Sequence, residues 1–312
     1  MEEASLKIFQ SQVLLPFTLG NGSTHAFLGP FISQNNKKFG NTLLPKDSTT
    51  LPFIHSSEID LSLFSDTTKI FRAFPPLKDR HLQWLLRVEQ AMSSSWVEAG
   101  IFEFIQLAKF DLHLFDPQML LSAIFFWNRE TRAFEFPCGF VCPTLLDIAA
   151  ITGLTPIGDR FHPDAVEEEI SIKEVSITWD KKTYIAFINA HVGQPGTPVS
   201  ESVHIVFFMY WLFAWGFCIP SLQVTKYYYV LAQALHLKKN ICLSKLLLAS
   251  LYTCLDEASG SLFRESGPRN LSGPLWLLQL WLNAILERKL SLTSSFTPTC
   301  ELEGARLTTL TP

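Results

Sequence analysis

The chain has 312 residues, a net charge of −4 and an apolar content of 47%, against 17% charged residues. That balance excludes a chain that stays unfolded, because such chains combine few apolar residues with a high net charge. It also gives no overall attraction to nucleic acid or anionic lipid, which both favour a basic protein. The six cysteines are too scattered for a small disulfide-bonded scaffold, so we expect a reducing compartment.

Residues 1–75 are predicted to form a loosely ordered arm. They are rich in Ser, Thr, Asn and Gly and show no sustained periodicity. Glu2 and Glu3 stand where a secretory signal peptide carries positive charge. We therefore expect no signal peptide.

Helical signals begin at Arg80, after which leucines recur at spacings of three and four residues. Ser95-Trp96-Val97-Glu98 fits a capping box, in which a hydroxyl and a Glu side chain satisfy free backbone N–H groups. It predicts a second helix that starts there. Asp116-Pro117 predicts a further helix start, with Asp as the cap and Pro at the first helical position.

The pattern changes between residues 127 and 142. Asn128–Thr131 is typical of a turn, Phe134-Glu135-Phe136 alternates in polarity, and Pro137 and Gly139 break the run. A short β-hairpin is predicted here.

The remaining segments favour helices. Thr144-Leu145-Leu146-Asp147 is another capping box, and Gly153 suits the left-handed residue that ends a helix. Val203–Ile219 carries no formal charge, which fits either a membrane span or a helix buried on all sides. We favour the buried helix and expect no membrane span.

Further helices are expected over residues 181–191, 226–236, 244–255 and 274–287. The sequence thus predicts a mainly α, multi-helix globular domain over residues 76–290, followed by a flexible tail over residues 291–312.

Motifs that build a reactive site from neighbouring residues are missing. The sequence contains no phosphate-binding loop, dinucleotide fingerprint, zinc-protease motif or nucleophile elbow. Cys138 and Cys142 lack the second half of a zinc site, so we interpret them as partly buried thiols. Asp111 and His113 lie close to Asp116, but Asp116 is already explained as a helix cap. We predict no metal and no cofactor.

Several stretches of the chain follow one another in the order and spacing of a known family. They are Trp96–Phe102, Phe126–Leu154, Tyr210-Trp211-Leu212 and Gly273–Trp281. Together they resemble the aminotransferase-like plant mobile domain, which is shared by certain plant transposons and by host proteins that maintain meristems. The resemblance covers residues 80–286, approximately.

The resemblance implies a nuclear protein that acts in transposon silencing, genome stability and meristem maintenance, with a phosphatase-like or chromatin protein as its partner. Aminotransferase activity is not expected, because a pyridoxal enzyme needs a Schiff-base Lys and an Asp partner that nothing here singles out. The residues that match the family motifs are our candidates for an interaction site: Trp96, Gly100, Trp127, Pro137, Gly139, Thr144, Asp147, Gly153, His204, Trp211, Trp276 and Trp281.

The chain departs from the family pattern at three positions. Members commonly carry an acidic residue where Phe140, Leu146 and Val203 stand here. These missing carboxylates weaken the case for an acidic site. Relatives usually continue beyond the segment that ends at Trp281, so we expect a shortened copy.

Three hypotheses about function follow. The first is a non-catalytic interaction module that presents Glu167–Glu169 and the hairpin near Trp127 to a protein partner. The second is a hydrolase-like enzyme in which Asp147, His204 and Asp111 converge in space to act as acid and base. The third is a nucleic-acid-binding domain, which adjacent basic pairs such as Lys181-Lys182 support only weakly.

Overall fold

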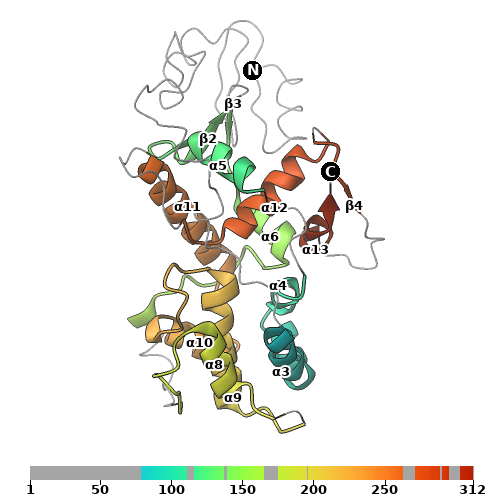
Figure 1. Ribbon diagram of the computed structural model, residues 1–312, viewed down its shortest axis with the longest axis vertical. Helices are drawn as coiled ribbons and strands as arrows, with labels where there is room; N and C mark the ends of the chain where they lie inside the picture. The colour runs from blue at the N-terminus through green and yellow to red at the C-terminus, as the bar shows by residue number, and fades with distance from the viewer. Residues whose placement is uncertain are drawn as a thin grey trace, which may run out of the picture. The chain divides into compact units, whose positions relative to one another are not determined.

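The structure is a computed structural model, and it describes residues 79–110, 116–136, 139–164, 175–194, 196–262, 271–288, 290–294 and 303–311. Helices dominate these residues, so the predicted mainly α fold is confirmed (Figure 1). The chain forms two compact units. The described residues of unit 1 lie within 117–143 and 255–269. Those of unit 2 lie within 79–116, 144–254 and 270–312. The expected arm lies outside the described residues, and the domain limits at 75 and 290 stay predictions.

Unit 2 holds most of the helices, with one short pair of strands. Its elements are α3 (Asp79–Glu98), α4 (Phe102–Leu107), α6 (Leu145–Thr152), α8 (Tyr184–His191), α9 (Glu201–Trp211), the π-helical turn η3 (Leu212–Gly216), the 3₁₀ turn η4 (Lys226–Tyr228), α10 (Tyr229–His236), the first part of α11 (Leu243–Leu262), α12 (Leu275–Leu286), α13 (Glu303–Thr308), and the antiparallel strands β4 (Thr293–Ser294) and β5 (Leu310–Thr311).

The centre of unit 2 is the continuous helix formed by α9 and η3. Every residue from His204 to Ala214 is buried, and α3, α8 and α10 pack around the helix (Figure 1). A helix that is apolar on all its faces must be covered on all of them, which explains the uncharged run in the sequence. Among the residues that the structure describes, no helix combines the length and apolarity that crossing a membrane requires.

Aromatic side chains from the N-terminal helices of unit 2 cover one side of α9. Trp96 stacks on Phe207 with ring centroids 5.8 Å apart, and Trp84 stacks on Tyr210 at 5.4 Å. Offset aromatic pairs of this kind add about 0.5–1.5 kcal/mol each beyond their buried area. Because Trp84 and Trp96 both belong to α3, the whole of this helix is needed to cover α9.

The predicted helix start at Ser95 is wrong. Helix α3 runs without a break to Glu98, and Trp96 is fully buried, as is Trp84 earlier in the same helix. Tertiary packing of Trp96 thus overrides the local capping signal. The next helix begins at Phe102, after a turn in which Gly100 adopts a left-handed φ of 66°.

The capping box before α6 forms as predicted. The Thr144 hydroxyl accepts a hydrogen bond from the Asp147 amide, and the Asp147 carboxylate accepts one from the Thr144 amide at 2.6 Å. Gly153 ends the helix with φ 73°, in the left-handed region that glycine adopts without steric cost. The two ends of α6 are therefore fixed by residues within the segment itself.

Unit 1 contains the predicted β-structure and one more strand than expected. Helix α5 (Pro117–Phe125) precedes β1 (Trp127–Asn128), β2 (Ala133–Phe136) and β3 (Gly139–Val141), which pair antiparallel in that order. The register places Trp127 opposite Phe134, and Phe134 opposite Val141. The hairpin near residues 127–142 is confirmed as part of a three-stranded sheet. The last part of α11 also belongs to unit 1.

The C-terminal residues form structure where the sequence predicted a flexible tail. Helix α13 packs against α6 and α12, and Leu307 and Leu310 are fully buried. Arg306 binds Glu287 through two parallel hydrogen bonds of 2.8 Å and also pairs with Glu303. The prediction failed because a short polar segment gives little sequence signal, whereas long-range packing holds it in place.

The contact between α13 and α6 predicts a strong effect at Gly304. A Cβ atom there would lie far inside contact distance of the Ile151 carbonyl oxygen. We expect Gly304→Ala to lower the free energy of unfolding by about 1–3 kcal/mol, although alanine favours helices over glycine. Urea denaturation measures this difference.

Gly216→Ala is the matched control, because Gly216 is also buried and the nearest atom to an added Cβ is 3.8 Å away. Equal stability of the two variants would contradict the close packing of α13 on α6.

Candidate functional site

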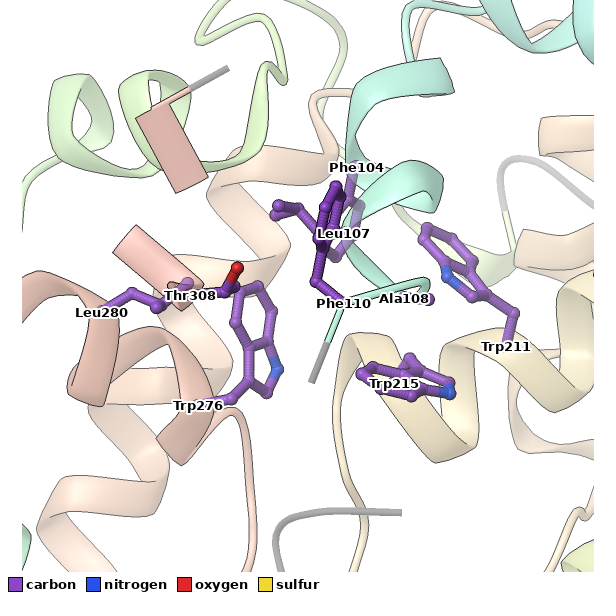
Figure 2. A pocket seen from close by; sticks show the side chains of 9 residues that line it. All are labelled: Phe104, Leu107, Ala108, Phe110, Trp211, Trp215, Trp276, Leu280 and Thr308. Carbon is purple, nitrogen blue, oxygen red and sulfur yellow. The ribbon is translucent and has the colours of Figure 1, made fainter. Parts of the chain in front are cut away.

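A pocket lined by aromatic side chains lies in unit 2, where α4, α9–η3, α12 and α13 meet. Its lining residues are Phe104, Leu107, Ala108, Phe110, Trp211, Trp215, Trp276, Leu280 and Thr308. Figure 2 shows the rings of Trp211, Trp215 and Trp276 around this space, with Phe104 and Leu107 on another side. Two of our candidate residues, Trp211 and Trp276, are thus brought together although they lie far apart in the sequence.

Phe104 connects the two candidate tryptophans. Its ring meets Trp211 edge-on at 4.8 Å and stacks on Trp276 at 5.9 Å. These contacts fix the rings of both tryptophans in one arrangement, because edge-to-face and offset-stacked pairs have defined geometries. The pocket wall is therefore preformed.

Trp276 carries one of two indole N–H groups in the lining that have no hydrogen-bond partner among the described residues, and Trp215 carries the other. The side chain of Trp276 is 7% exposed, and its Nε1–H is buried. Figure 2 shows this nitrogen on the edge of the ring that faces the Trp215 side of the pocket. A buried donor without a partner costs about 1–3 kcal/mol. A ligand with an acceptor at this edge would recover that free energy.

The chemistry of the lining limits what the pocket can hold. Among the described residues of the lining, Thr308 is the only polar side chain besides the indole groups, and its hydroxyl already donates to the Ala305 carbonyl at 2.7 Å. None of these described lining residues is charged, so they do not balance a phosphate, a carboxylate or a cation. The arrangement suits a neutral apolar group that carries one hydrogen-bond acceptor.

A second cluster in unit 2 joins two other candidates, Trp96 and His204. Trp96 Nε1 donates to His204 Nε2 at 2.8 Å, and His204 Nδ1 lies 2.9 Å from Nδ1 of His236. The other nitrogen of His236, Nε2, lies 3.9 Å from the Glu201 carboxylate. A chain of polar groups therefore leads from the buried indole of Trp96 to an exposed carboxylate.

The direction of each hydrogen bond in this cluster follows from the tryptophan. An indole N–H can only donate, so Nε2 of neutral His204 must accept and its Nδ1 must carry the proton. His204 then donates to His236 Nδ1. The proton on His236 is left at Nε2, on the side of Glu201. Both histidines are held in a single tautomer.

Burial keeps His204 uncharged. Desolvation, with a smaller contribution from His236, lowers the pKa of His204 from 6.5 to about 3. A base that weak is poorly matched to proton transfer near neutral pH, for which a pKa near the working pH is best. In this setting His204 acts as a hydrogen-bonded part of the core.

In unit 1 the candidate Trp127 anchors the sheet to α11. Its Nε1 donates to the Asp256 carboxylate at 2.8 Å, and its carbonyl accepts from the Ser259 hydroxyl at 3.1 Å. Asp256 also forms an ion pair with Arg132, which holds a left-handed φ of 55° in the turn before β2. One carboxylate thus positions both ends of the β1–β2 turn.

A buried carboxylate fixes the rest of that turn. Glu135 is 4% exposed and accepts from Asn128 Nδ2 at 2.7 Å and from the Thr131 hydroxyl at 3.3 Å. Desolvation raises the pKa of Glu135, although both hydrogen bonds oppose the shift. Arg129 and Glu130 remain exposed at the tip. The hairpin that we predicted as an interaction surface therefore presents a charged, rigid turn.

The remaining candidates have structural positions or lie outside the described residues. Gly100 forms the turn between α3 and α4, Gly139 begins β3, and Trp281 is buried in α12. Thr144, Asp147 and Gly153 fix the ends of α6, as described above. Pro137 and the acidic run Glu167–Glu169 lie outside the described residues.

The predicted acid–base group is not assembled by the hydrogen bonds of the described residues. Asp147 binds Thr144, whereas His204 binds Trp96 and His236. Asp111, the third member, lies outside the described residues. In the part of the chain that the structure describes, no three His, Cys, Asp or Glu side chains gather as metal ligands would.

Sequence reasoning missed Phe104, Thr308 and His236. Phe104 looked like one more core residue of a helix, and Thr308 fell in the predicted tail. No local signal could have found either role, because the pocket joins segments about 200 residues apart. His236 was visible as a histidine at the end of a predicted helix, but its partner is set only by the packing of α10 on α9.

Together these features define a mainly helical protein with a tryptophan-lined pocket. The family model of the plant mobile domain matches residues 100–300. The chain therefore belongs to the plant mobile domain family. No curated protein and no solved structure matches this chain.

The buried neutral histidines predict a stability that falls in acid. Burial lowers the pKa of His81 to about 4 and that of His204 to about 3, so the unfolded chain binds protons below pH 6.5 that the folded chain does not. We expect the free energy of unfolding to fall between pH 6.5 and 4, by up to about 1.4 kcal/mol per pH unit for each histidine. Urea denaturation at several pH values measures this slope.

His204→Gln should reduce the slope, because it removes one of the groups that titrate only on unfolding. His162→Gln is the control, since His162 is exposed. A slope that His204→Gln leaves unchanged would show that this histidine is not held neutral by burial.

Proposed function

We propose that the chain is a non-catalytic interaction module, in which the tryptophan-lined pocket receives an apolar side chain of a protein partner. Two indole groups of the lining, those of Trp215 and Trp276, have a buried Nε1–H without a partner among the described residues. The observation that carries this proposal is the Nε1–H of Trp276, which lies on the edge of its ring that faces the Trp215 side of the pocket (Figure 2). A backbone carbonyl of the bound segment would accept from it. Burial of the side chain and this single hydrogen bond would together orient the partner.

The choice of a peptide follows from the lining. An aliphatic side chain of the peptide would fill the apolar space. A backbone carbonyl next to that side chain would then lie close enough to accept the hydrogen bond. The described lining residues would leave a charged cofactor unbalanced, because none of them is charged. A buried aromatic pocket that receives one anchor residue is also the usual centre of a protein interface.

The absence of catalysis is part of the same proposal. The two described members of the suspected acid–base group are engaged elsewhere, Asp147 in a helix cap and His204 in the core. The motif residues of the family that the structure describes are mostly caps, turns and buried tryptophans. These are the residues that maintain a scaffold.

Membership of the plant mobile domain family supports a more specific role. The chain would act in the nucleus in transposon silencing, genome stability and meristem maintenance, with a phosphatase-like or chromatin protein as its partner.

The pocket predicts a specific loss of peptide binding. Peptides selected from a random display library on the folded chain should bind Trp276→Phe about tenfold more weakly, because this variant keeps the ring and removes the N–H. Isothermal titration of a selected synthetic peptide measures the affinity.

Trp84→Phe is the matched control. Trp84 is also buried with an Nε1 that lacks a partner among the described residues, but it does not line the pocket. If both variants bind equally well, or if no peptide is selected, the pocket is not the binding site.

The proposed nuclear role predicts a change in transcription. Plants that lack the protein should accumulate transcripts of transposable elements, and the wild-type gene should restore silencing whereas the Trp276→Phe gene should not. RNA sequencing of meristem tissue measures both. Unchanged transposon transcripts in the mutant would contradict the role in silencing, while leaving peptide binding by the pocket to be judged by titration.

A further inference from the structure

A surface on unit 2 combines one exposed aromatic ring, one half-buried aromatic ring and exposed lysines. We call it the Tyr227 patch, and it consists of Trp179, Lys181, Lys182, Lys226 and Tyr227. The two segments that supply it lie side by side, because the Val224 amide donates to the Lys182 carbonyl at 2.9 Å and Thr183 pairs with Gln223 in an antiparallel bridge. The patch is therefore set by backbone contacts and not by the lysine side chains.

Tyr227 is the accessible aromatic ring of the patch, whereas Trp179 is half-buried. Tyr227 is 80% exposed, more than any other large apolar residue that the structure describes. Its ring meets Tyr228 edge-on at 4.9 Å, and Tyr228 in turn stacks on Phe217 at 4.8 Å. Since Tyr228 is itself packed on Phe217, it holds Tyr227 at the surface, where most of the Tyr227 side chain is open to solvent.

Other exposed apolar residues do not share this setting. Val97, Leu146, Ile157 and Ile185 are aliphatic and offer no flat π-surface. Beside Tyr227, by contrast, the ammonium group of Lys226 lies 5.5 Å from the centre of the Trp179 ring. An isolated exposed tyrosine needs no explanation, but Tyr227 directly follows Lys226, whose ammonium group lies over a second aromatic ring.

The local charge is opposite to that of the whole chain. Segments 175–183 and 219–229 contain three lysines and a single acidic residue, Asp180. Lys181 and Asp180 are 3.5 Å apart, but both side chains are more than half exposed, so their attraction is screened by water. The two segments therefore carry more positive than negative side chains on a chain of net charge −4.

We propose that the Tyr227 patch binds single-stranded nucleic acid. Bases stack on exposed aromatic rings whatever their sequence, and lysines beside the rings attract the phosphates. Bases are free to stack only when they are unpaired, which favours a single strand over a duplex. This binding is separate from the pocket of Trp276, because the patch shares no residue with the pocket lining.

Fluorescence anisotropy of labelled dT₂₀ and U₂₀ with the full chain tests the proposal, with a 20-base-pair duplex as a competitor. Both single strands should bind, and the logarithm of the affinity should fall with the logarithm of salt concentration with a slope of about −2, as expected for three lysines. A difference between dT₂₀ and U₂₀ would identify DNA or RNA as the preferred strand.

Variants separate stacking from charge. Tyr227→Ala should weaken binding about tenfold and Tyr227→Phe by less than twofold, because phenylalanine keeps the ring. Lys226→Gln should reduce the salt slope by about 0.7. Lys245→Gln is the control, since Lys245 is an exposed lysine outside the patch. Tyr227 is exposed, so its replacement should leave folding intact, which circular dichroism checks.

Three results would overturn the proposal: no binding of either single strand at 50 mM salt, equal binding by Tyr227→Ala and wild type, or equal competition by the duplex. Peptide binding by the Trp276 pocket should be unaffected by Tyr227→Ala, so failure of one proposal does not entail failure of the other.

Discussion

The burial of α9 and η3 on every side is the constraint on which unit 2 depends. Each face of this helix needs a partner, and α3, α8 and α10 supply them. Large aromatic residues on the helix contribute roughly 1.5–3 kcal/mol each through burial. The partners are consequently fixed by aromatic stacking, as between Trp84 and Tyr210. Loss of this central helix would expose the face of every element that packs on it.

The same burial determines what the polar groups of the helix can do. His204 lies in a setting that disfavours charge, so it stays neutral and uses both ring nitrogens in hydrogen bonds within the core. Trp211 and Trp215 lie four residues apart near the end of the buried run and line the pocket with Phe104. The central helix thus provides a rigid core at its start and the wall of a pocket at its end.

The features that the sequence predicted correctly are those encoded locally. Thr144, Asp147 and Gly153 lie within one short segment, and their chemistry alone fixes both ends of α6. The turn residues that begin at Asn128 and the alternating polarity around Glu135 likewise predict the hairpin from a short segment.

Predictions failed where distant packing decides the outcome. The signal at Ser95 was overridden because Trp96 packs on Phe207, more than 100 residues away. The C-terminal segment was predicted to be a flexible tail, yet Gly304 permits α13 to approach Ile151 closely. The pocket could not be predicted for the same reason: each of its tryptophans alone is typical of a core, and only the fold shows which indole N–H groups are left without a partner among the described residues.

The most direct test of the central claim is a ¹H–¹⁵N spectrum of the protein labelled at its eight tryptophans. The indole signals of Trp276 and Trp84 are assigned from the spectra of the variants that lack them. On addition of a peptide that binds the chain, the Trp276 signal should move downfield, as expected when an indole N–H gains an acceptor, and the Trp84 signal should stay. A peptide that binds while the Trp276 signal remains in place would contradict the account.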